Sequence, residues 1–112
     1  MSLFEKWSTA MENRDVEGLM NCLHEDYTFV RHQTGSTMNR EEMGEMLRGF
    51  MSNDAVVVHE RHCLYENEEV LIERSVMDFP DGSRESVLGF NQLKDGKIIR
   101  SETGATLIKQ SS

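Results

Sequence analysis

Apolar residues recur three and four positions apart through the first half of the chain, which is the spacing of one helix face. The first such set is Leu3, Phe4, Trp7, Ala10 and Met11. Ser2 and Glu5 form an S-x-x-E capping box that predicts the start of this helix. A second helix is predicted from Asp15, whose side chain can cap it, and a third from Asn39. Their apolar faces are Val16, Leu19, Met20 and Leu23, and then Met43, Met46, Leu47, Phe50 and Met51.

From residue 55 onward the pattern is that of β-strands, with runs at 55–65, 70–79, 84–93 and 97–108. Turn signals separate the runs at Asn67, at 80–83 and at the Asp95-Gly96 dipeptide. Strands joined by tight turns pair antiparallel, so these four form a meander. A short strand at 27–30 lies between the second and third helices. The chain is therefore expected to be a single α+β domain spanning residues 1–112.

Charge, hydropathy and the N-terminal segment argue against nucleic-acid and membrane partners and against secretion. With 12 Lys and Arg against 20 Asp and Glu, the formal net charge is −8, and the basic residues are scattered among acids. This argues against nucleic-acid binding, which needs clustered basic side chains. No apolar run is long enough to span a membrane, and the start does not resemble a signal peptide. The expected compartment is the cytoplasm.

Cysteine and histidine spacing gives no metal or redox motif. Cys22 and Cys63 are far apart and are expected to be free and buried. His59 and His62 come within one residue of an H-E-x-x-H zinc signature, but on a strand they would face opposite sides of the sheet. Neither a metal nor a cofactor is therefore expected.

Three segments together resemble the nuclear transport factor 2-like superfamily, which includes SnoaL-like cyclases and ketosteroid isomerases. They are 7–19 (WSTAMENRDVEGL), 24–29 (HEDYTF) and the hairpin 93–99 (LKDGKII). The resemblance implies a cone in which three N-terminal helices pack on a strongly curved antiparallel sheet around a pocket. It does not fix the function, because this fold hosts enzymes, binding modules and association domains.

The catalytic residues of the isomerases are not retained in this chain. Aligned on the resemblance, the tyrosine donor falls on Trp7, the general base on Arg31 and the protonated aspartate donor on Gly89. These residues supply neither the base nor the oxyanion donors that the isomerisation needs. The chain is therefore not expected to be a ketosteroid isomerase.

Strand alternation, anchored on an inward-facing Arg31, predicts which side chains line the pocket. The predicted ligand pocket is Trp7, Met11, Tyr27, Arg31, Phe50, Met77, Asn91, Ser101 and Thr103. The same alternation turns Glu60, His62 and Leu64 inward, together with Glu73 and Ile99. A bulge or a one-residue slip would exchange the two faces of a strand, and would present His32 in place of Arg31.

Two functions fit this interior. In one, Arg31 binds a small polar or anionic molecule, and the protein either only binds it or also acts on it through His62 and Glu73 by cofactor-free acid–base chemistry. In the other, the polar groups pair with each other, for example Arg31 with Glu73, and fill the cone of a non-catalytic binding or dimerisation module.

An apolar cluster is expected on the opposite face of the sheet, which the helices do not cover. It consists of Ile72, Val76, Leu88 and Phe90. Such a cluster would be exposed in a monomer and buried in a back-to-back homodimer, and the superfamily resemblance implies the same assembly.

Overall fold

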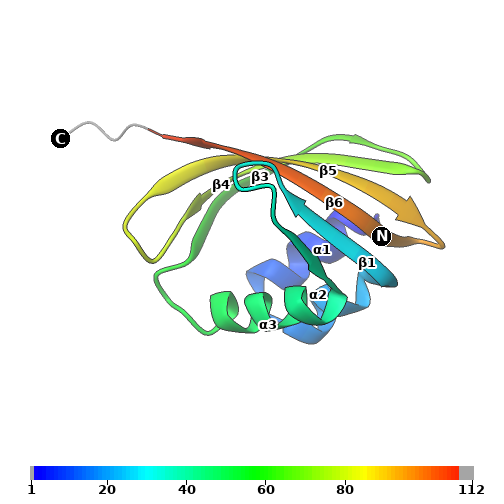
Figure 1. The fold of residues 1–112 in the computed structure, drawn as a ribbon, viewed down its shortest axis with the longest axis horizontal. Helices are drawn as coiled ribbons and strands as arrows, with labels where there is room; N and C mark the ends of the chain where they lie inside the picture. Colours follow the sequence, from blue (N-terminus) through cyan, green and yellow to red (C-terminus); the bar gives the residue numbers. More distant parts are fainter. Residues whose placement is uncertain (1, 109–112) are drawn as a thin grey trace.

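Three helices lie against one face of a curved sheet in the computed structural model, which describes residues 2–108 (Figure 1). The helices are α1 (Leu3–Glu12), α2 (Val16–Asn21) and α3 (Arg40–Met51). The strands are β1 (Leu23–Arg31), β2 (Thr37–Asn39), β3 (Val57–Glu66), β4 (Val70–Asp78), β5 (Arg84–Lys94) and β6 (Lys97–Leu107). The α+β cone expected from the sequence is confirmed.

Each helix begins at the residue that the sequence predicts. Ser2 and Asn39 both form complete capping boxes, and the side chain of Asp15 accepts a hydrogen bond from the backbone N–H of Gly18. The second helix is shorter than expected, because Leu23 leaves it to begin β1 and pair with Ile98 of β6. No helix within residues 2–108 is long and apolar enough to cross a membrane.

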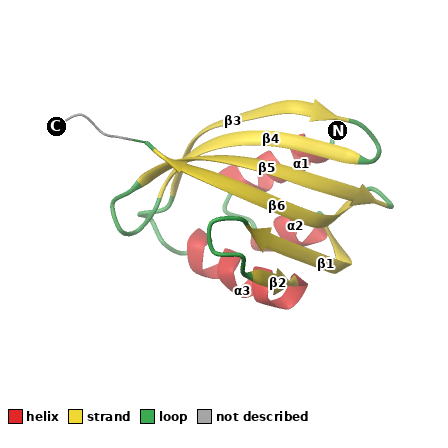
Figure 2. Cartoon of the chain, turned by 45° about the horizontal axis from the view of Figure 1, so that its top comes forward, coloured by secondary structure: helices red, strands yellow, loops and turns green. Residues whose placement is uncertain are grey.

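The six strands are ordered β2-β1-β6-β5-β4-β3 (Figure 2). The predicted antiparallel meander from β3 to β6 is confirmed. In contrast, β1 lies parallel to β6, with Phe29 opposite Ser101, so the sheet is not wholly antiparallel. The tight-turn argument does not apply to this pair, because α3 and the whole meander separate the two strands in the sequence.

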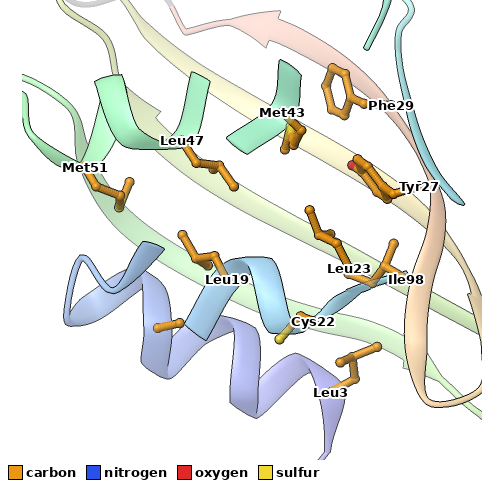
Figure 3. Packing of buried hydrophobic residues seen from close by; sticks show 11 residues of the cluster. Leu3, Leu19, Cys22, Leu23, Tyr27, Phe29, Met43, Leu47, Met51 and Ile98 are labelled. Atoms are coloured by element: carbon orange, nitrogen blue, oxygen red, sulfur yellow. The ribbon is translucent and has the colours of Figure 1, made fainter. Parts of the chain in front are cut away.

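The hydrophobic core lies between the helices and the β1 end of the sheet (Figure 3). Leu19 of α2 and Leu23 of β1 are almost fully buried there and pack with Tyr27 and Ile98. Both cysteines are free; Cys22 is buried in this core as expected, whereas Cys63 is exposed on β3. The part of the concave face beyond this core is left for a cavity.

A β-bulge changes which residues of β3 face the helices. The register shifts between Val58 and Glu60, after which Arg61 pairs with Ser75 and His62 with Arg74. A bulge inserts one unpaired residue, so alternation reverses beyond it. The predictions that Glu60 and His62 face inward are therefore wrong, and Arg61 faces inward instead.

A second irregularity, between Gln92 and Leu93, has the same effect near the start of β6. Ile98, rather than the expected Ile99, is the buried residue there. Leu64, which was also expected to face inward, is 52% exposed beside a further register shift in β3. These departures from strict alternation share one cause, a local change of register.

Candidate functional site

A cavity of about 500 Å³ lies between the concave face of the sheet and the helices α1 and α3. This volume is within the range of small-molecule sites. Its apolar walls include Trp7, Met11, Phe29, Met46, Phe50 and Met77. Its polar lining includes Arg31, Arg61, Glu73, Ser75, Asn91 and Ser101. The rim carries Asp81 from the β4–β5 loop and Glu85 from the start of β5.

A buried ion pair joins β3 to β4 inside the cavity. Nη2 of Arg61 donates to Oε1 of Glu73 at 3.0 Å, and the two side chains are only 10% and 16% exposed. Nε of Arg61 donates to Oγ of Ser8 at 3.0 Å, and the guanidinium lies 5.5 Å from the ring centre of Phe4. Helix α1 therefore holds Arg61, which in turn holds Glu73.

The carboxyl group of Glu73 has an unusual environment for an acid. Burial raises the pKa of Glu73, while the charge and hydrogen bond of Arg61 oppose the rise. The side chain of Glu73 lies over Gly89, where a Cβ would be at contact distance, 3.4 Å from Cγ of Glu73. The carboxyl group of Glu73 on β4 and the backbone of Gly89 on β5 thus form adjacent parts of the cavity wall.

Arg31 and Glu73 lie at opposite ends of one row of paired residues that crosses four strands. The register runs from Arg31 to Thr103, then to Gly89 and Glu73 across four adjacent strands. Nη2 of Arg31 contacts Sδ of Met46 at 3.7 Å, and the guanidinium lies over the Phe29 ring. Within residues 2–108 no carboxylate is within 4.0 Å of it. The Arg31–Glu73 pair expected for a filled cone is therefore absent.

The inner end of the cavity holds a closed set of hydrogen bonds. Oγ of Ser101 donates to Oδ1 of Asn91 at 2.6 Å, and Nδ2 of Asn91 donates to the carbonyl of Leu71 at 3.0 Å. Burial raises the pKa of the neighbouring Tyr27, which therefore stays a neutral phenol. These groups are satisfied by each other and fix the shape of the inner end.

The predicted pocket residues all line the cavity, and Glu73 lies among them. His62 does not. It is 50% exposed, and its Nε2 is 3.6 Å from a carboxylate oxygen of Glu60. His32 is also outside the cavity, bonded to Glu102 at 2.8 Å, so Arg31 is the inward residue of that pair. Strand alternation missed Arg61 of β3, because nothing in the run His59–His62 reveals the bulge.

A curved sheet closed by helices around a partly polar cavity defines a class of protein, that with the cone-shaped α+β fold. Within that class, the chain belongs to the SnoaL-like domain family, whose model matches residues 4–101. The sequence matches none of the curated proteins significantly.

Solved structures with the same fold are numerous and distant in sequence. A nuclear transport factor 2-like protein from Mesorhizobium loti has a TM-score of 0.76 at 11% identity, covering 93% of this chain and 88% of that one. A steroid delta-isomerase from Pseudomonas aeruginosa has a TM-score of 0.69 at 15% identity, covering 93% and 77%. A Catenulispora acidiphila protein in complex with trimethylamine has a TM-score of 0.69 at 16% identity, covering 91% and 83%. At these identities the likeness shows the fold alone.

Proposed function

We propose that this protein binds a small amphipathic anion in the cone, with Arg31 holding its carboxylate. The observation that carries the proposal is that, among the described residues, only one of the two cavity arginines is paired with an acid. Arg61 already has Glu73 as its partner, whereas Arg31 has a thioether and an aromatic ring beside it. A guanidinium stays protonated when partly buried and offers a planar fork that fits a carboxylate.

The rest of the ligand is expected to be apolar. Methionine and aromatic side chains surround Arg31 along α3 and β1, and the polar groups at the inner end are already hydrogen-bonded. Methionine side chains are flexible enough to fit ligands of different shape. A polar head at Arg31 with an apolar body inside therefore matches the chemistry of the walls.

Glu73 is the group that we propose for any acid–base chemistry on the ligand. Its pKa is raised by burial, its Oε2 makes no hydrogen bond to the described residues, and its side chain covers Gly89. A carboxyl group with a raised pKa accepts a proton more readily than an ordinary carboxylate does. Since Trp7, Arg31 and Gly89 replace the isomerase residues, we expect no measurable isomerisation of a β,γ-unsaturated ketosteroid.

Replacing Arg31 with methionine should weaken anion binding strongly and leave stability nearly unchanged. Loss of a charge-assisted carboxylate contact should weaken binding by about 30-fold to 100-fold. The measurement is a titration of Trp7 fluorescence with a panel of alkyl carboxylates, because Trp7 is the only tryptophan and lines the cavity. Thermal unfolding of the same samples gives the ligand-induced stabilisation.

Two controls separate charge recognition from general hydrophobic binding. Arg48→Met makes the same change on the exposed side of α3, outside the cavity lining, and should bind as the wild type does. Alkylammonium ions of matched length test the opposite charge, which the rim acids Asp81 and Glu85 could favour. Binding of the ammonium alone would overturn the anion proposal. No binding together with a strongly destabilised Arg31→Met would favour the non-catalytic module.

The outer sheet face is proposed to form a two-fold interface between two copies of the chain. Ile72 and Phe90 are directly paired there, and Leu88 and Phe90 are 51% and 39% exposed. Phe90→Glu should convert a dimer into a monomer, because each two-fold contact would bury two charges. Light scattering measures the molecular mass of the assembly. Leu107→Glu is the control, because Leu107 is an exposed leucine outside the cluster of Ile72, Val76, Leu88 and Phe90. A monomeric wild type, or a dimeric Phe90→Glu, would contradict the proposed face.

A further inference from the structure

A second cavity adjoins the cone on the outer side of α1. It occupies about 490 Å³ between α1 and β3, the strand at the edge of the sheet. Phe4, Met51, Val56 and Val58 supply its apolar lining. Its polar lining is Ser8, Glu12, Arg14, His59, Glu60 and Arg61. Glu12, Arg14, His59 and Glu60 are exposed, whereas Arg61 is largely buried in its pair with Glu73.

The two cavities share one wall, made of Met11, Met51 and Arg61, which line both. Arg61 is fixed in this wall by Ser8 and by Glu73. The two methionines make no hydrogen bond that would hold them, and they pack in the apolar core cluster. An unbranched thioether changes rotamer at low cost, so Met11 and Met51 are the movable part of the wall.

We propose that the second cavity is the tail subsite of the same ligand, which is a long-chain alkyl carboxylate. This rests on the proposed function, with the head group at Arg31. The chain runs along the methionines of α3, displaces the side chains of Met11 and Met51, and ends against Phe4 and Val58. The Arg61–Glu73 pair stays in place beside the opening. Continuity with the cone and the apolar lining on both sides of the methionines support one occupant for both cavities.

The test is a length series of saturated carboxylates from hexanoate to hexadecanoate, titrated by Trp7 fluorescence below their micellar concentrations. Each buried methylene should raise the affinity about threefold to fourfold. Val58→Phe places a ring in the second cavity only, because Val58 does not line the cone. Phenylalanine suits a strand, so this variant is expected to fold. Val70→Phe is the matched control on β4, outside both cavities.

In the expected result, the wild type and Val70→Phe gain affinity up to the longest chains. Val58→Phe binds the short carboxylates with the same affinity as the wild type, and binds the longest ones at least tenfold more weakly. The inference is overturned if the wild type gains nothing beyond the short chains, or if Val58→Phe follows the wild type throughout. Both of these results leave Arg31-dependent binding of short carboxylates, and hence the proposed function, intact. If no member binds, the proposed function fails as well.

Discussion

Replacing Arg61 with methionine should destabilise the protein by about 2–4 kcal/mol at neutral pH, because it leaves the carboxylate of Glu73 buried without its partner. The Arg61–Glu73 pair is largely shielded from water, so water can replace little of the interaction that Glu73 loses in the variant. The variant also loses the hydrogen bond from Arg61 to Ser8 on α1. Urea denaturation of both proteins gives the difference in the free energy of unfolding.

This loss should shrink as the pH falls. The folded-state pKa of Glu73 is already raised by burial, and the positive charge of Arg61 now limits the rise. Without Arg61 the pKa rises further. A raised pKa means that the folded state binds the proton more tightly than the unfolded chain, so acidification favours the folded variant. The deficit relative to the wild type therefore decreases as the pH falls through the raised pKa.

Two further variants identify the cause. In the double variant Arg61→Met with Glu73→Gln, no buried charge remains, and most of the lost stability should return. Arg84→Met breaks a surface pair of similar length, in which Nε of Arg84 lies 2.7 Å from Asp78. Hydrogen bonds from Arg84 and His59 hold the pKa of Asp78 at about 2, so Asp78 stays ionised between neutral pH and about pH 5 and its own titration adds no pH dependence to this loss. A pH-independent deficit in Arg61→Met would contradict the role given to Glu73.

Leu19→Ala should cost about 3–4 kcal/mol, in the middle of the range for buried leucines. Leu19 is 0% exposed and is the only buried residue of α2. A helix of six residues is too short to be stable alone, so its packing through Leu19 is what keeps it folded. Leu64→Ala, the same change at a residue that is 52% exposed, should cost less than about 1 kcal/mol.

Guanidinium denaturation of both leucine variants measures this contrast, with circular dichroism as the probe of helix content. Equal losses at the two positions would show that α2 is held by contacts other than that of Leu19. A loss of helix signal before the main transition would show that α2 can detach by itself.

The fold was predictable from the sequence wherever local interactions decide it. Capping residues such as Ser2 and Asp15 act on the backbone of the next turn, and the Asp95-Gly96 dipeptide forms its hairpin turn with both residues at positive φ. The parallel contact of β1 with β6 was not predictable in this way. It depends on segments at opposite ends of the chain, and no turn sequence encodes it.

The site was predictable to the extent that strand alternation holds. It holds along β4 from Glu73 to Met77, where every pairing is regular. It fails in β3, where the bulge sends His62 to the outer face and brings Arg61 inside. No glycine or proline marks the position of this bulge in the sequence of β3. The extra residue is accommodated by the pairing with β4, which the sequence of β3 alone does not reveal. The partner of Glu73 therefore became apparent only from the structure.

The parallel contact between β1 and β6 also determines when the cavity can form. Phe29 and Arg31 pair with β6, which follows all the other described strands in the sequence. Helices α1 to α3 can form early, since their caps are local, but β1 has only the short β2 beside it until β6 arrives. Contacts so distant in the sequence slow folding, because the intervening chain must be ordered first. During synthesis, the edge of β1 that pairs with β6 therefore stays open until β6 has been made.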